Sequence, residues 1–156
     1  MHLNREKGAT FIELIVVVIL IAIVAAYASP SFQAMMQKYR VESGQSDLTK
    51  VLKEAKRMAR MESTTVTVTL ANFVNDPSTI TLTSSAGAND VTTLAEGVSF
   101  GAPVAVTFSA IGTTAPPADG FFRITVSHDD VPALQRFVDV YASGQTVSHL
   151  PSFDPM

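Results

Sequence analysis

An apolar segment of twenty residues lies near the N-terminus of this chain. Between residues 9 and 28, only Thr10 and Glu13 are clearly polar. About twenty consecutive apolar residues are enough for a helix to cross a bilayer. Arg5 and Lys7 precede the segment, and positive charges before a first span keep that end in the cytoplasm. We therefore expect a single-pass membrane anchor, with the bulk of the chain on the far side of the membrane.

The end of this segment allows a second interpretation. The small residues in Ala26-Tyr27-Ala28, followed by Ser29, are typical of the cut site of an ordinary secretory signal. Cleavage after Ala28 would release a soluble periplasmic domain. Glu13 favours the anchor, because an ionised carboxylate inside an apolar span costs about 2.5–3.5 kcal/mol and is expected only where it has a function.

Length and charge limit the rest of the chain. The 156 residues suffice for one compact domain plus an extended element. The absence of cysteine excludes a disulfide framework and thiolate metal sites. Cations outnumber acidic residues between residues 38 and 62, whereas from Ser63 onward only Arg123 and Arg136 are basic. The C-terminal part is therefore acidic.

Helical periodicity continues past Pro30, which should bend the helix, and Gly44 is a second weak point. Apolar residues recur at helical spacing in two stripes, the second of which should pack on a sheet. The stripes are Phe32, Met35, Met36 and Tyr39, then Leu48, Val51, Leu52, Ala55, Met58 and Ala59.

From Thr64 the apolar period changes to two, which predicts β-strands. Ser143-Gly144 predicts a tight hairpin turn. The expected strands are 64–70, 79–83, 104–108, 121–127, 136–142 and 145–149, with loops at 72–77, 84–90 and 112–120. The sequence thus predicts an α+β fold, in which a long N-terminal helix with a transmembrane first half packs on an antiparallel β-sheet.

The N-terminal motif carries a family resemblance. Lys7-Gly8 precedes Ala9-Thr10-Phe11-Ile12-Glu13-Leu14, an apolar run follows, and Pro30 closes it. This order resembles the signal sequence of type IV pilins and pseudopilins. The resemblance implies that a prepilin peptidase cuts between Gly8 and Ala9 and N-methylates Ala9, although the family most often has phenylalanine there. It also implies that Glu13 sets assembly register by pairing with the N-terminal ammonium of an adjacent subunit.

Weaker patterns further along resemble the GspH/FimT group within that family. They are Leu48 to Leu70, Val106-Thr107-Phe108 with Gly112, and Val138 to Val147. The resemblance implies a minor pseudopilin of a type II secretion system, in the bacterial inner membrane and periplasm, with other pseudopilins or pilins as partners. The expected organisation is a leader (1–8), a transmembrane assembly helix (9–29), an amphipathic helix (30–62) and a β-rich periplasmic head (63–156).

A nucleic-acid role is the main functional alternative, as in a FimT-like minor pilin for pilus assembly or DNA uptake. Clustered cations supply most nonspecific affinity for nucleic acid, so the candidate contacts are Lys50, Lys53, Arg57 and Arg60. A solvated helix face explains the same residues. The C-terminal tail from Leu150 has no cation, and an acidic head should repel nucleic acid.

No pattern indicates catalysis, a cofactor or a metal. His128-Asp129-Asp130 precedes Val131-Pro132, and aspartates favour a turn at such a position. His149 should lie on the surface at the end of the last strand. Neither a nucleotide-binding glycine loop nor a nucleophile motif is present, so we expect that the chain is not an enzyme.

Overall fold

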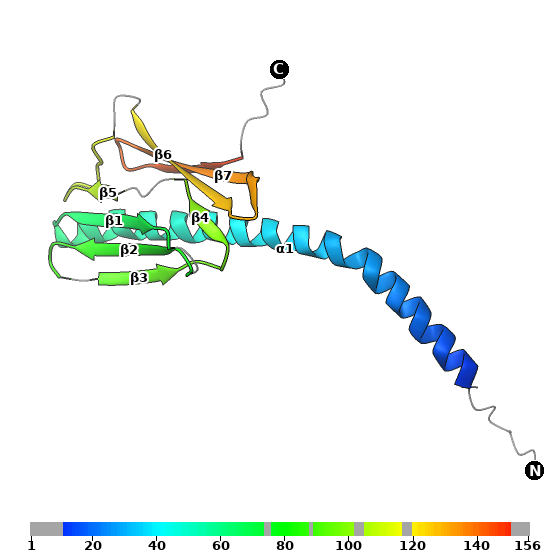
Figure 1. Cartoon of the computed structure of the whole chain (residues 1–156). Helices are drawn as coiled ribbons and strands as arrows, with labels where there is room; N and C mark the ends of the chain where they lie inside the picture. The colour runs from blue at the N-terminus through cyan, green and yellow to red at the C-terminus, as the bar shows by residue number, and fades with distance from the viewer. Residues whose placement is uncertain (1–10, 74–75, 88, 102–104, 117–119, 151–156) are drawn as a thin grey trace, which may run out of the picture. The chain divides into compact units, whose positions relative to one another are not determined.

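The computed structural model describes residues 11–73, 76–87, 89–101, 105–116 and 120–150, with residues 27–30 described only as backbone within a helix. The chain divides into two compact units, residues 1–36 and 37–156. One helix, α1 (Phe11–Glu62), belongs to both (Figure 1). The strands that follow are β1 (Val66–Ala71), β2 (Thr79–Ser84), β3 (Asn89–Thr93), β4 (Val98–Phe100), β5 (Ala105–Phe108), β6 (Phe121–His128), β7 (Val131–Tyr141) and β8 (Thr146–His149).

The strands form two antiparallel sheets, where the sequence had predicted one. One sheet has the order β3-β2-β1-β5 and the other the order β4-β6-β7-β8. The alternation in β1 sets its faces, because Val66, Val68 and Leu70 are buried while the threonines between them are not. The predicted α+β fold, a long helix followed by antiparallel strands, is confirmed.

The part of α1 that lies in the second unit supplies one wall of the core. Leu48, Leu52, Ala55 and Ala59 are completely buried. They recur at i, i+3 and i+4 spacing, which places them on one face of the helix. Full burial of a leucine side chain contributes about 1.5–3 kcal/mol. This apolar stripe was predicted from the sequence, and it packs against both sheets in a single hydrophobic cluster.

Gly44 has a different role from the one the sequence suggested. The helix continues through it, and the residue is buried. A Cβ atom at this position would lie 3.0 Å from Val98 Cγ1 and 3.4 Å from Val126 Cγ1. Gly44 therefore allows close approach of α1 to β4 and β6, and the prediction of a weak point in the helix was wrong.

The strand predictions missed two elements and shortened a third. β3 was expected to be loop up to Asp90, but it is an exposed, polar edge strand that lacks an apolar alternation. β4 has only three residues and gave no periodic signal. β7 was expected to begin at residue 136, but it begins at Val131. Pro132 does not end the strand, because it lies in a bulge between the Val131 and Gln135 pairings, where proline is tolerated.

The two sheets are linked by the side chain of Asn72, which follows β1. Its amide nitrogen donates to the carbonyl of Phe100 at 2.6 Å, and its oxygen accepts from the Phe100 amide at 2.9 Å. Phe100 lies on β4, at the edge of the second sheet. The side chain thus occupies backbone groups that an edge strand otherwise leaves to solvent.

Both predicted turns are confirmed. Ser143 is part of the turn between β7 and β8, and Gly144 follows it with a positive φ of 69°. The Gly144 amide donates to the carbonyl of Tyr141 at 2.8 Å, which closes the hairpin. Asp129 and Asp130 form the turn between β6 and β7.

Candidate functional site

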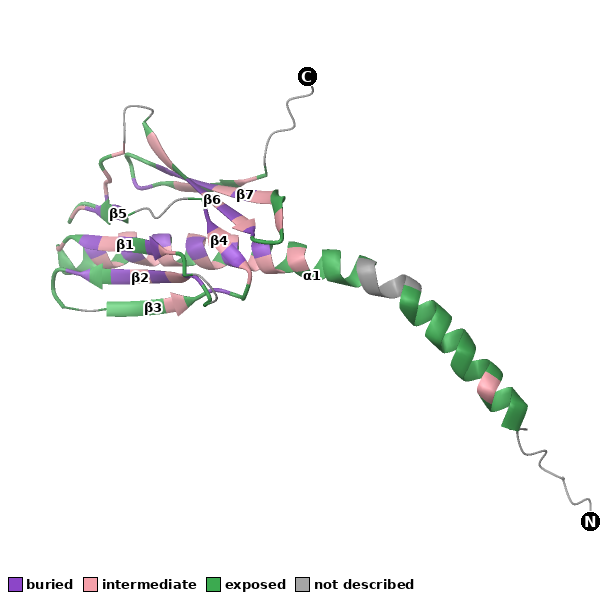
Figure 2. Cartoon of the chain, viewed as in Figure 1, coloured by how far each residue is buried: buried purple, intermediate pink, exposed green. Residues whose placement is uncertain are grey.

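The first unit presents an apolar helix surface. Along α1 from Phe11, which is 80 % exposed, to Val24, which is 68 % exposed, large apolar side chains lie on every side of the helix. Figure 2 shows this segment almost entirely as exposed. Monomeric soluble proteins rarely expose apolar patches larger than a few hundred Å², so such a surface marks a membrane or protein contact. Its members include Phe11, Ile12, Leu14, Val16, Val17, Val18, Ile19, Leu20, Ile21, Ile23 and Val24.

Within the described residues, no single helix is long and apolar enough to cross a membrane. By length and composition, only the bent pair of stretches Phe11–Ala26 and Ser31–Glu62, taken together, could do so.

The predicted processing residues Gly8 and Ala9 lie outside the described residues. Glu13 lies in the first turn of α1 with an exposed side chain, where the helix dipole favours a negative charge. Pro30 falls within the bounds of α1, but its side chain is not described, so the kink assigned to it stays a prediction.

The structure brings the predicted basic residues together on one exposed face of α1. Lys50, Lys53, Arg57 and Arg60 are all exposed, on the side away from the buried stripe. Some of this charge is compensated locally, because Lys50 Nζ lies 2.8 Å from Asp47 Oδ1 and Arg57 pairs with Glu54. Hydrogen bonding from Arg57 lowers the pKa of the Glu54 carboxyl. The face is therefore a partly paired, solvated helix surface.

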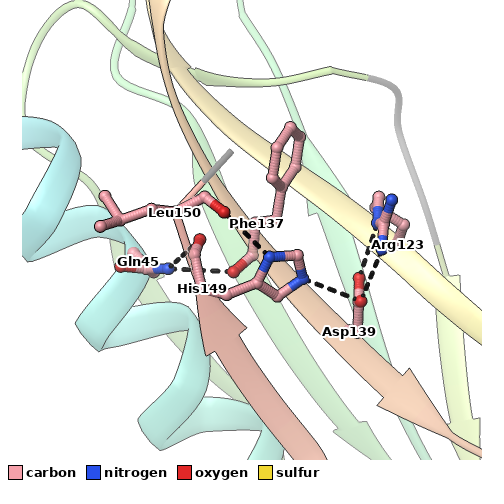
Figure 3. Close-up of polar contacts among 6 residues, drawn as sticks. All are labelled: Gln45, Arg123, Phe137, Asp139, His149 and Leu150. Carbon is pink, nitrogen blue, oxygen red and sulfur yellow. Dashed lines mark hydrogen bonds and ion pairs between the residues drawn. The ribbon is translucent and has the colours of Figure 1, made fainter. Parts of the chain in front are cut away.

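A polar cluster on the second sheet was not singled out from the sequence. Arg123 on β6 donates from Nε and Nη2 to the two carboxylate oxygens of Asp139 on β7, both at 2.9 Å (Figure 3). His149 Nε2 on β8 lies 2.9 Å from Asp139 Oδ2. Hydrogen bonding from Arg123 holds the pKa of Asp139 below its ordinary value, since it outweighs the opposing effect of burial, and His149 acts in the same direction.

This cluster ties the last strand to the sheet and to α1. The His149 side chain is only 36 % exposed, and its ring packs on Phe137 with centroids 5.6 Å apart. Gln45 Nε2 on α1 donates to the Phe137 carbonyl at 2.9 Å. His149 is therefore half-buried and bonded, and not simply on the surface. The sequence feature that could have revealed this cluster is the pair of opposite charges, Arg123 and Asp139, which face each other across the β6–β7 hairpin.

His128 is held by the turn that follows β6. Its Nδ1 accepts from the Asp130 amide at 3.2 Å. Its Nε2 is buried and has no partner in the described part of the chain, where it lies under Gly97. Among the described residues, no group of three histidine or carboxylate side chains could hold a metal ion.

Comparison with known proteins yields one match. Residues 3–29 match the family model described as the prokaryotic N-terminal methylation motif. This motif is a type IV pilin-like prepilin signal. No curated protein and no solved structure gives a significant match.

The chain thus carries the prepilin signal of the type IV pilin-like class, followed by an α+β fold of the pilin kind. The motif indicates a membrane-anchored N-terminal helix and N-terminal methylation. It also implies processing by a prepilin peptidase and assembly with pilin-like subunits. Gly8, Ala9 and Glu13 all lie within the matched residues.

Proposed function

We propose that this chain is a minor pseudopilin of the GspH/FimT group and a structural subunit of a type II secretion pseudopilus that helps to export folded proteins. The observation that carries the proposal is that the prepilin signal at residues 3–29 contains an exposed apolar helix surface, between Phe11 and Val24. Apolar contact with neighbouring helices can replace lipid contact when such a helix leaves the membrane. The function is mechanical, and the proposal assigns no catalytic residue.

Glu13 has a specific task in this proposal. A carboxylate left alone in an apolar bundle is heavily penalised, whereas one that pairs with the N-terminal ammonium of a neighbour is tolerated. The charge thus favours correct axial register over slipped register. Glu13 acts on the specificity of assembly more than on its strength.

The choice of a secretion machine over DNA uptake rests on charge. The cations on α1 are partly paired by Asp47 and Glu54, and the chain from Ser63 onward is acidic. Nonspecific nucleic-acid affinity requires several cations that neutralise phosphates together. A gel shift of the full chain in micelles at near-physiological salt should therefore show no complex with duplex DNA.

Assembly and secretion test the proposal together. In cells that lack the chromosomal copy, Glu13→Ala should insert into the inner membrane but fail to enter filaments, and exported proteins should accumulate in the periplasm. Lys38→Ala, a change at an exposed position of the same helix outside the apolar surface, should restore both filament entry and export. Normal assembly of Glu13→Ala would contradict the role of Glu13. Normal export in cells without the chain would contradict the secretion function.

A further inference from the structure

His149 on β8 has a hydrogen-bond acceptor beside each of its two ring nitrogens. Nε2 lies 2.9 Å from the carboxylate oxygen Oδ2 of Asp139, and Nδ1 lies 3.1 Å from the backbone carbonyl oxygen of Leu150 (Figure 3). A carbonyl oxygen and an ionised carboxylate can only accept. A neutral imidazole has a single N–H group, so it can satisfy only one of these neighbours, whereas the imidazolium ion satisfies both.

The two contacts differ in strength. Hydrogen bonding from Arg123 holds the pKa of the Asp139 carboxyl below its ordinary value, so this acceptor stays ionised near neutral pH. A hydrogen bond to a carboxylate is stronger than one to a neutral carbonyl. When the imidazolium of His149 loses a proton, the proton on Nε2 should therefore stay beside Asp139 and the one on Nδ1 should leave. Nδ1 then presents a lone pair to the Leu150 carbonyl oxygen, and the contact becomes repulsive.

The charged groups around the ring act in opposite directions. Asp139 on β7 favours the imidazolium, and Arg123 on β6, which binds the same carboxylate, disfavours it. On the side of α1, the backbone carbonyl of His149 accepts from the neutral Gln45 side chain at 3.4 Å. Three further charged side chains of α1 line a surface cavity beside Ser148 of β8, namely Glu42, Lys50 and Lys53. Histidine is the side chain whose charge changes near physiological pH.

The contact with Leu150 lies at the end of an edge strand. β8 is the outermost strand in the order β4-β6-β7-β8, and Leu150 directly follows it. The Leu150 side chain is exposed, so burial contributes little to holding it in place. The free edge of a sheet is the part that can pair with another chain. The state of the His149 ring therefore bears on the order of the chain at this edge.

We propose that His149 is a pH-sensitive latch, which holds Leu150 at the end of β8 while the ring is protonated and releases it when Nδ1 loses its proton. The step transfers one proton from Nδ1 to solvent and breaks one hydrogen bond, the one to the Leu150 carbonyl. The bond from Nε2 to Asp139 and the pairing of β8 with β7 remain. The latch lies within the second unit and does not depend on the proposed secretion function.

Nuclear magnetic resonance of the full chain in micelles, with ¹⁵N labelling, tests the latch. The His149 ring should carry protons on both nitrogens at about pH 5 and only on Nε2 at about pH 9. Over the same change, the order parameter of the Leu150 amide should fall from about 0.85 to below about 0.6. That of Val147, which pairs with Asp139 within the sheet, should stay near 0.85. An order parameter of Leu150 that does not change with pH would overturn the proposal.

His149→Gln is the matched variant. A glutamine amide can still donate to Asp139, but it has no proton to lose in this pH range. Leu150 should therefore be equally mobile at both pH values in this chain. Leu150→Ala keeps the backbone carbonyl and should keep the pH response. If the His149→Gln chain responded to pH as the native chain does, the response would belong to another group and the proposal would be wrong.

Discussion

The two parts of α1 use similar apolar residues to opposite effect. Between Phe11 and Val24 the large apolar side chains are exposed, whereas between Val41 and Ala59 one stripe is buried against the strands. The first part is apolar all round, so no single face could be covered by a sheet. The second part is amphipathic and finds its partner within its own chain. The second part therefore contributes to folding, whereas the first is available for a membrane or for other subunits.

A substitution in the buried stripe of α1 should have the greatest effect on stability. Leu52→Ala removes a completely buried side chain and should lower the free energy of unfolding of the second unit by about 2–5 kcal/mol. Val17→Ala, at a position 49 % exposed, is the matched change in the first part and should leave that stability within about 0.5 kcal/mol. Amide hydrogen exchange of β6 and β7 in micelles measures both. Equal losses would contradict the division of roles.

The Asp139 cluster should make the stability of the second unit depend on pH. Asp139→Asn should cost about 1.5–3 kcal/mol, because Arg123 and His149 lose an ionised partner. The folded pKa of Asp139 is lowered, so its contribution is complete above the unfolded value of about 3.9 and is lost as pH falls through the folded value. Unfolding measured from pH 7 down to pH 2 should show this loss in the native chain. The Asp139→Asn variant should not show this loss of stability at low pH. If its pH profile were identical to that of the native chain, the contribution of Asp139 would be excluded.

Close packing at Gly44 tests how α1 meets the second sheet. Gly44→Val should destabilise the second unit by about 1–3 kcal/mol, because a Cβ there already approaches Val98 Cγ1 within 3.0 Å. Ser46→Val introduces the same residue at an exposed position of the same helix and reports only its helix propensity. Chemical denaturation compares the two. A cost no greater than that of Ser46→Val would show that the close approach does not matter.

The smallest effect belongs to the exposed basic face. The Lys50 side chain is 72 % exposed and pairs with Asp47. Lys50→Ala removes this pair and should change the free energy of unfolding by less than about 0.5 kcal/mol. The change should shrink further at high salt, because exposed pairs are screened. Denaturation at low and high salt measures it. A loss above 1 kcal/mol would mean that this face supports the fold and is not merely solvated.

The sequence predicted the elements with strong periodic signals. The buried stripe of α1 and the positions of β1, β2 and β6 followed from apolar spacing, and the prepilin signal followed from Gly8, Glu13 and the apolar run. β3 was missed because a polar edge strand has no buried face to impose alternation. The Asp139 cluster was missed because its members meet only through sheet pairing, which brings Arg123, Asp139 and His149 from three strands together.

The most direct test of the division along α1 is the intact mass of the mature chain, purified from the inner membrane of cells that contain a prepilin peptidase. We predict a chain that lacks residues 1–8 and begins at Ala9, so that the exposed apolar part of α1 is retained for assembly. A mature chain that begins at Ser29, with the apolar segment removed as an ordinary signal, would contradict the account.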